Sequence, residues 1–352
     1  MPTSAGIPRT TAPLAEGEMG RNKSSQLRVI LVYRRRVAGA YSIEALFHTI
    51  AEVLRSQVEL IEYETGRRWW ILWDLWKLRR LKADVYHLTA GINYFALLLP
   101  WSRTVLTVPD IGHFLFGLTG FKRWIYKWIW LKGPLHAARS LTAISRETQG
   151  MIVSHLGIPR NRIRVIECCF GADFRPVART FRDECPVLLQ LGTRPYKNVP
   201  ALVEAIRGIR CRLVLVGRLD SGLRKILVES GIDFSNRIDL SAEEIVQQYI
   251  DCDIVTFVSL GEGFGVPVIE AQASGRPIVT SNISPLREVA GEGACLVNPL
   301  DPADIRDGIL RIITDSSYRA GLVERGLVNA DRFSPAVISG QYLDLYKETA
   351  AS

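Results

Sequence analysis

The chain has 352 residues, more than one compact core usually holds, so two domains are expected. Its net charge of +8 suits an anionic partner, and three classes compete: nucleic acid, an acidic membrane surface and a phosphorylated small molecule. No uninterrupted apolar run reaches the roughly 18 residues that a membrane-spanning helix needs, so a transmembrane protein is not expected.

The N-terminal residues and the cysteines indicate the compartment of the protein and whether metal or disulfide sites are expected. Residues 1–25 are small, polar and proline residues without an apolar segment, and they predict a disordered lead rather than a signal peptide. The six cysteines form no Cys-x-x-Cys pair and show no metal spacing with the five histidines. We therefore expect a cytoplasmic protein with neither a zinc site nor a disulfide framework.

Strand-like and helical segments alternate along the chain. In the first half, strands are expected at 27–33, 58–63, 85–89, 104–108, 141–144 and 163–166. In the second half, they are expected at 187–191, 212–217, 238–240, 254–258, 277–280 and 294–297. This alternation favours parallel sheets covered by helices, arranged as two Rossmann-like halves. The polar stretch 179–184 is predicted to be the hinge between them.

A glycine-rich turn at residues 259–265 joins a buried strand to a helix in the second half. Pro267 suits the first turn of that helix, and Gly275 suits its end. Such a turn directs backbone N–H groups and the positive end of a helix at one spot, which suits a phosphate. Glu262 and Glu270 flank this spot, where a phosphate would repel them, so we expect them to accept hydrogen bonds from ribose or sugar hydroxyls. The alternative is a glycine turn with two solvated glutamates.

Basic residues follow the strand at 187–191, in the loop that begins at Gly192. Arg194 and Lys197 leave the end of this strand, and parallel strands end at the same edge of a sheet. Both cations should therefore face the same edge as the glycine turn, where they could neutralise a diphosphate leaving group.

Asp110 and His113 follow the strand at 104–108 and should lie at the carboxyl edge of the first sheet. Both are candidates for the acceptor side. His113 is a candidate hydrogen-bond partner or general base for an acceptor, and the alternative is a purely structural histidine.

Seven of the eight tryptophans lie in two basic segments, one from Arg67 to Lys82 and the other from Phe121 to Lys132. Tryptophan favours the headgroup boundary and basic side chains attract anionic lipid, so the segments predict peripheral contact with an anionic membrane. The alternative places most tryptophans in the core of the first domain. Single-stranded nucleic acid also binds basic and aromatic residues, but nothing else resembles such a module, so no nucleic-acid partner is expected.

Residues 261–302, GEGFGVPVIEAQASGRPIVTSNISPLREVAGEGACLVNPLDP, resemble the signature of family 4 glycosyltransferases, with Glu262 and Glu270 as the paired glutamates. The stretch LGTRPYKN at 191–198 resembles that family's donor-phosphate loop, and residues 141–176 resemble its interdomain region. The similarity covers nearly everything from residue 27 onward.

The resemblance implies an α/β GT-B architecture, in which two Rossmann-like domains face each other across a cleft. Residues 26–180 would form the acceptor domain, residues 185–334 the nucleotide-sugar domain, and residues 335–352 a helix that crosses back to the first domain. The implied activity is retaining hexosyl transfer, without metal or cofactor, from a nucleotide-diphosphate sugar to a lipid-linked or polysaccharide acceptor at the cytosolic membrane face. The alternative is a catalytically weak, glycosyltransferase-like binding subunit of a glycan-assembly system.

The resemblance also implies roles for individual residues. Arg194 and Lys197 would hold the donor diphosphate, Glu270 the ribose and Glu262 the transferred sugar. In the implied front-face displacement, the leaving phosphate accepts the acceptor proton while the two cations stabilise its charge. The other residues implied in donor binding are Gly39, in a loop over the phosphates, together with Gly192, Gly263, Phe264, Gly265 and Val266.

Two positions depart from the family pattern. Pro109 stands where the family often has a histidine that touches the donor sugar, and Cys169, Phe170 and Gly171 replace the usual asparagine-glycine turn. Pro109 motivates the weakly catalytic alternative. Neither the nucleotide base, the sugar nor the acceptor is predicted.

Overall fold

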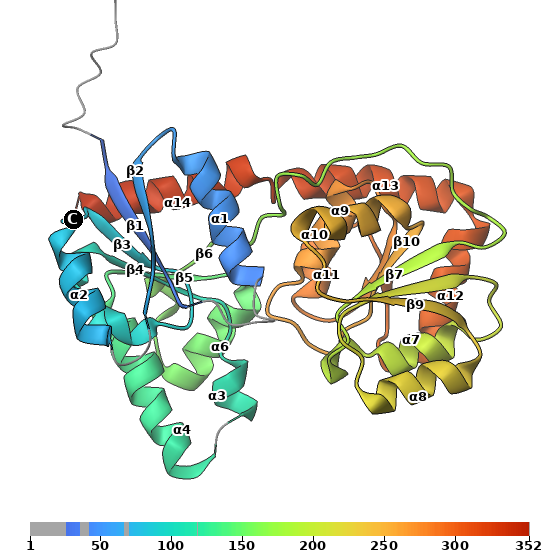
Figure 1. Cartoon of the computed structure of the whole chain (residues 1–352), viewed down its shortest axis with the longest axis horizontal. Coiled ribbons are helices and arrows are strands. Elements are labelled where there is room, and N and C mark those ends of the chain that lie inside the picture. The colour runs from blue at the N-terminus through green and yellow to red at the C-terminus, as the bar shows by residue number, and fades with distance from the viewer. Residues whose placement is uncertain (1–25, 36–41, 67–69, 118, 352) are drawn as a thin grey trace, which may run out of the picture.

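The structure is a computed structural model that describes residues 26–35, 42–66, 70–117 and 119–351. Figure 1 shows two lobes side by side, each built on a sheet with helices packed around it. Within these residues, each sheet has six strands, in the order β2-β1-β3-β4-β5-β6 in the first lobe and β12-β11-β10-β7-β8-β9 in the second. Neighbouring strands pair in parallel, as in Val29 with Val85 and Leu189 with Val255. The predicted α/β fold with two parallel sheets is confirmed.

The strands of the first lobe are parallel and end at one edge of the sheet, where loops lead into the covering helices. Strands β1 and β4 are buried along nearly their whole length because both faces of the sheet are covered there. They are β1 (Arg28–Tyr33), β2 (Glu59–Glu64), β3 (Val85–Leu88), β4 (Thr104–Val108), β5 (Ser140–Ala143) and β6 (Ile163–Val165). Helices and helical turns are α1 (Ser42–Leu54), α2 (Ile71–Arg80), η3 (Asn93–Leu97), η4 (Trp101–Arg103), α3 (Gly112–Phe116), α4 (Gly120–Tyr126), η5 (Lys127–Lys132), α5 (Gly133–Ala137), α6 (Arg146–Leu156) and η6 (Arg160–Arg162).

The second lobe repeats the alternation of strand and helix. Its strands are β7 (Val187–Leu191), β8 (Arg212–Val216), β9 (Asp233–Arg237), β10 (Ile254–Phe257), β11 (Ile278–Ser281) and β12 (Cys295–Val297). Its helices are η7 (Pro195–Lys197), α7 (Val199–Ile206), α8 (Ser221–Ser230), α9 (Ala242–Asp251), α10 (Val266–Ala273), α11 (Leu286–Ala290), α12 (Pro302–Thr314) and α13 (Ser316–Asp331). The last helix, α14 (Pro335–Ala350), returns along the first lobe (Figure 1).

The strand expected at 238–240 is wrong: the strand in this part of the chain is β9, which ends at Arg237. Helix α8 ends at Gly231, which has a φ of 68°, and the chain then enters β9 almost at once. Strand β9 pairs with β8 from Asp233 opposite Arg212 to Arg237 opposite Val216. Ile238 lies beyond this pairing and is exposed, so its β-branched side chain was a misleading signal.

The tryptophans of the two basic segments lie largely at the surface, which contradicts the alternative that most of them are core residues. Trp70, Trp73, Trp76, Trp124 and Trp128 are between 45% and 58% exposed. Basic side chains cover some of these rings: the Arg80 guanidinium lies 4.2 Å from the Trp76 ring centre, and Lys132 Nζ lies 4.9 Å from that of Trp128. Residues 67–69 lie outside the described residues.

Helix α14 is joined to the first sheet by a buried polar chain. The Tyr346 hydroxyl lies 2.7 Å from His87 Nδ1, and His87 Nε2 lies 2.7 Å from Thr107 Oγ1. Thr107 in turn contacts Thr142 on β5, with 2.6 Å between the two hydroxyls. The helix also packs against α1, β3 and β4. The predicted domain limits stay a prediction.

His87 makes the stability of the fold dependent on pH. Its burial lowers the pKa of the imidazole to about 3, against about 6.5 for an unfolded chain. Between these values the unfolded chain binds a proton that the folded chain does not. We therefore expect the free energy of unfolding to fall on acidification from pH 6.5 toward pH 3, with His87 contributing about 1.4 kcal/mol per pH unit. Urea denaturation at a series of pH values measures this slope.

The matched variants are His87→Gln and His155→Gln. His155 is exposed on α6, so its replacement should leave the steep decline in place, whereas His87→Gln should flatten it. An identical slope for wild type and His87→Gln would show that His87 is not the titrating group.

Candidate functional site

The strand order of the second sheet creates one crevice where ligands of such sheets bind. Counted from β7, the order is that of a doubly wound sheet, and it reverses between β7 and its neighbour β10. The loops after these two strands leave in opposite directions, so a crevice opens between them at the carboxyl edge. The basic loop predicted from Gly192 to Lys197 follows β7, and the glycine turn follows β10.

The basic loop is tied to the glycine turn by backbone and amide hydrogen bonds. The Leu260 N–H donates to the Tyr196 carbonyl at 2.8 Å. Asn198 has a φ of 58°, and its side-chain amide donates to the Val258 carbonyl at 3.1 Å and to the Pro299 carbonyl at 2.7 Å. These bonds hold the two loops in one arrangement in the absence of a ligand.

Lys197 and Glu262 meet in this crevice. Lys197 Nζ lies 2.7 Å from Glu262 Oε1, and both side chains are only 13% exposed. The ammonium also lies 4.2 Å from the centre of the Phe257 ring. Gly192 has a φ of 84°, and a Cβ at this position would lie 2.8 Å from Lys197 Cε, so glycine leaves the room that the lysine stem occupies. Arg194, at the start of η7, is exposed.

The glycine turn begins α10 as predicted, and it also touches the first lobe. Gly265 caps the helix with a φ of 110°, Pro267 lies in the first turn, and no side chain caps the helix. Pro267 has no N–H, and the Val268 N–H donates to the Gly265 carbonyl at 2.9 Å. Among the described residues, the Val266 N–H is left as the donor of this turn that suits an anion. A Cβ at Gly263 would lie 3.3 Å from the Pro109 carbonyl oxygen and 3.7 Å from the Asp110 Cβ, so the turn faces the end of β4.

Glu270 lies one helical turn further along α10 and is half-buried. Its Oε2 accepts a hydrogen bond of 2.6 Å from the Tyr249 hydroxyl. Burial raises the pKa of Glu270 to about 7, while the Tyr249 hydrogen bond and the Lys197 charge act to lower it. This carboxyl group therefore changes its charge near neutral pH.

The first lobe adds Asp110 to the site. The Asp110 carboxylate is exposed and accepts the Gly112 N–H at 2.9 Å, so it caps the start of α3. Its charge also acts on Tyr196. Burial raises the pKa of the Tyr196 hydroxyl, the charges of Glu262 and Asp110 raise this pKa further, and the charge of Arg194 lowers it.

Two predicted residues lie beyond the described part of the chain. Gly39 lies in the segment 36–41, which is outside the described residues, and so does the side chain of His113 in α3. Within the described residues, no group of three or more His, Cys, Asp and Glu side chains is arranged to hold a metal ion. A reaction without metal stays a prediction.

Sequence reasoning missed two residues that shape the site. The asparagine at 198 had a readable signal, because asparagine tolerates positive φ better than most residues and it follows the basic loop directly. No signal in the sequence pointed to Tyr249, since it lies 21 residues before Glu270 on a different helix. Only the packing of α9 beside α10 brings the two side chains together.

Comparisons with known proteins show the family of the chain and its fold. Residues 27–173 match the family model Glycosyltransferase Family 4, and residues 185–315 match the family model Glycosyl transferases group 1. The two models together cover most of the chain, and its fold is that of the GT-B glycosyltransferases. The chain belongs to the family 4 glycosyltransferases.

The chain is similar to two curated mannosyltransferases and to one solved structure. The O-antigen chain mannosyltransferase B of Escherichia coli is 29% identical over 300 residues, which cover 77% of this chain and 76% of that protein. The MMP alpha-(1->4)-mannosyltransferase of Mycolicibacterium hassiacum is 31% identical over 226 residues, 60% of this chain and 54% of the relative. The structure of Anabaena HepE in complex with UDP and glucose has a TM-score of 0.74 at 15% identity, over 92% of this chain and 100% of that one. The last likeness shows the shared fold.

Gly265 and Gly208 allow a test of the glycine turn. Both have positive φ, but a Cβ at Gly265 would lie 2.4 Å from Leu286 Cδ2, whereas at Gly208 it would meet no atom within 4 Å. Gly208→Ala should lower the free energy of unfolding by about 1 kcal/mol through backbone strain alone. Gly265→Ala should lower the free energy of unfolding by about 1–3 kcal/mol more than Gly208→Ala does, because Leu286 must move. Urea denaturation compares the two, and equal losses would contradict the packing described here.

Proposed function

We propose that this glycosyltransferase uses a nucleoside diphosphate sugar and transfers the sugar, with retention of its anomeric configuration, to a lipid-linked or polysaccharide acceptor. The observation that carries the proposal is the meeting of Lys197, Glu262 and the glycine turn between β7 and β10. A cation and a backbone N–H suit the diphosphate of such a donor and its leaving oxygen, and a carboxylate suits the sugar hydroxyls.

The donor diphosphate is proposed to bind between the basic loop and α10. Lys197 and Arg194 supply two positive charges, and the start of α10 supplies the Val266 N–H. Without a ligand, Lys197 is neutralised by Glu262. A bound diphosphate would share the lysine, and Glu262 would then accept hydrogen bonds from the sugar beside the 263–266 backbone. Glu270, one turn deeper, is proposed to accept the ribose hydroxyls.

The transfer is proposed to proceed on one face of the sugar. The acceptor hydroxyl attacks the anomeric carbon from the side on which the bond to the diphosphate breaks, and its proton passes to the leaving phosphate oxygen. Lys197 and Arg194 stabilise the charge that develops on that phosphate, so neither a protein nucleophile nor a metal is required. Asp110 lies on the facing lobe, where an acceptor hydroxyl would approach.

Relatives suggest which donors to test first. The E. coli and M. hassiacum relatives are named as mannosyltransferases, and the Anabaena HepE complex holds UDP and glucose. GDP-mannose is therefore the first donor to test and UDP-glucose the second.

The first lobe is proposed to contact an anionic membrane at the cytosolic face. Exposed tryptophans with basic neighbours lie on α2 and on α4 and η5. Turn η3 lies between these segments: Arg79 donates to the Leu98 carbonyl at its end, and Asn93 donates to the Trp130 carbonyl. One lipid surface could therefore meet both segments. None of the helices in the described ranges combines the length and apolar character needed to cross a bilayer.

Lys197→Ala and Glu270→Ala should each abolish most of the transfer. Losing a cation at the leaving group or the ribose anchor should lower kcat/KM by about 100-fold or more. The measurement is release of nucleoside diphosphate from GDP-mannose or UDP-glucose, with an undecaprenyl-linked glycan as the acceptor.

Lys225→Ala is the matched control. Lys225 is an exposed lysine on α8 that contacts Glu229 at 3.7 Å, and its loss should leave the rate unchanged. Full activity in both site variants would contradict the proposed site. Donor binding without turnover in the wild type would instead support the alternative of a binding subunit, to which Pro109 points.

Flotation with liposomes tests the membrane contact. The wild type should float with vesicles that contain anionic lipid and much less with neutral ones. Trp73→Ala combined with Trp76→Ala should weaken flotation several-fold, because these rings are exposed beside Lys77 and Arg80. Arg224→Ala combined with Lys225→Ala removes two exposed cations of the second lobe and should have no such effect. Undiminished flotation of the tryptophan variant would contradict this surface.

A further inference from the structure

Among the residues that the structure describes, Tyr249 makes the one hydrogen bond to the Glu270 carboxylate. It is a fully buried residue near the end of α9, and its hydroxyl donates to Glu270 Oε2 at 2.6 Å. The other carboxylate oxygen, Oε1, has no hydrogen-bond partner among the residues that the structure describes. One oxygen of the carboxylate is thus held by the protein, while the other remains available to a ligand.

Few other charged or titratable groups act on Glu270. From α9 it faces the Tyr249 hydroxyl, and from the loop after β7 it feels the charge of Lys197, which is itself paired with Glu262. The tyrosine therefore does two things: it aims the carboxylate, and it stabilises its ionised form against the effect of burial.

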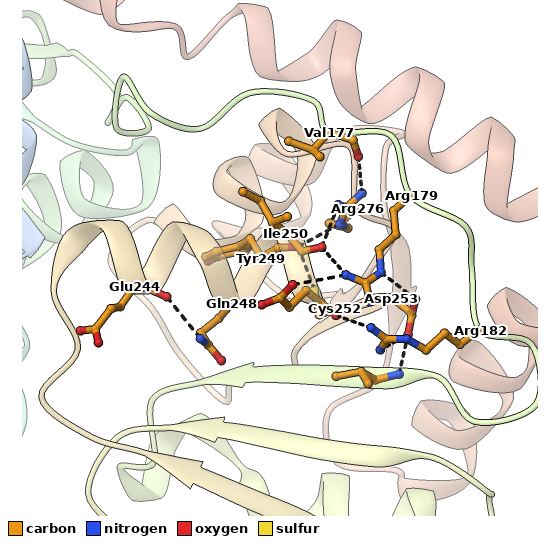
Figure 2. A network of polar contacts seen from close by, with 12 residues as sticks. Val177, Arg179, Arg182, Glu244, Gln248, Tyr249, Ile250, Cys252, Asp253 and Arg276 are labelled. Atoms are coloured by element: carbon orange, nitrogen blue, oxygen red, sulfur yellow. Dashed lines mark hydrogen bonds and ion pairs between the residues drawn. The ribbon is translucent and has the colours of Figure 1, made fainter.

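Tyr249 is in turn held by the segment that joins the two lobes (Figure 2). The Tyr249 carbonyl accepts from Arg276 Nε at 2.9 Å, and the same guanidinium donates to the Val177 carbonyl at 3.0 Å. Arg179 donates to the neighbouring Ile250 carbonyl at 2.8 Å. The Phe174 ring lies edge-on to the tyrosine ring, with 5.2 Å between their centres.

These contacts change the picture of the predicted hinge at 179–184. Arg179 and Arg182 bind carbonyls at the end of α9 and the buried Asp253, so these two arginines hold the stretch against the second lobe. Guanidinium groups satisfy the last carbonyls of a helix and favour its negative end. The end of α9, with Tyr249, is therefore fixed in space.

We infer that Tyr249 is a positioning residue that fixes Glu270 so that its free oxygen accepts a ribose hydroxyl of the donor. This rests on the proposed function, because it requires the ribose to lie at Glu270. It deepens that proposal by assigning ribose recognition to a tyrosine-carboxylate pair rather than to the glutamate alone.

Calorimetric titration of the full chain tests the inference with UDP or GDP, whichever binds the wild type, and with the 2′-deoxy form of the same nucleotide. A hydrogen bond to a charged group should make the wild type prefer the ribose form by about tenfold to a hundredfold. Tyr249→Phe should lose most of this preference, while its affinity for the 2′-deoxy form should stay near that of the wild type.

The pH dependence provides a readout that a merely structural role would not move. In the wild type the preference for ribose should grow as the pH rises through the pKa of Glu270, near 7. In Tyr249→Phe the midpoint should move to higher pH, because the hydrogen bond that lowers this pKa is gone while burial still raises it.

Tyr346→Phe is the matched control, since Tyr346 is also fully buried and its hydroxyl makes one bond, of 2.7 Å, to His87. The Tyr346→Phe variant should be less stable, but it should keep the wild-type preference for the ribose nucleotide and the wild-type pH midpoint of that preference. The inference is overturned if Tyr249→Phe keeps both, or if the wild type binds a nucleotide without preferring ribose. A wild type that binds neither UDP nor GDP overturns the proposed function, and this inference with it.

Discussion

The ion pair between Lys197 and Glu262 is the interaction on which the rest of the site depends. Both side chains are largely shielded from water, and either charge alone would be costly there. Because they are paired, the protein can keep a cation and a carboxylate side by side where little water reaches them. The glycine at 192, the αL asparagine at 198 and the Leu260 to Tyr196 hydrogen bond all hold the lysine loop where this pair can form.

The contact between the lobes follows from the same geometry. The glycine turn that carries Glu262 has no side chain at Gly263, where the Pro109 carbonyl and Asp110 of the first lobe approach. A second link between the lobes is helix α14, which follows the second lobe in the chain and binds the first sheet through Tyr346 and His87. The carboxyl edge of one sheet is thus brought against the turn of the other, and an acceptor bound to the first lobe would meet a donor bound to the second.

The sequence predicted the fold and much of the site because both depend on local patterns. Parallel strands end at one edge, so residues that follow strands, such as Lys197 and Glu262, could be brought together before any coordinates were known. Packing between helices has no such signal. Neither the bond from Tyr249 to Glu270 nor the pinning of Arg179 to the end of α9 could be predicted, since each joins segments whose approach depends on the tertiary fold. The exposure of the tryptophans was undecided for the same reason, because their helices are apolar on more than one face.

A crystal structure of the chain with a bound nucleoside diphosphate sugar tests the central claim most directly. We predict diphosphate oxygens within hydrogen-bond distance of Lys197 Nζ, Arg194 and the Val266 N–H at the start of α10, with a ribose hydroxyl on Glu270. A nucleotide bound elsewhere, for example on the basic surface of α2 with the Lys197 to Glu262 pair unchanged, would contradict it.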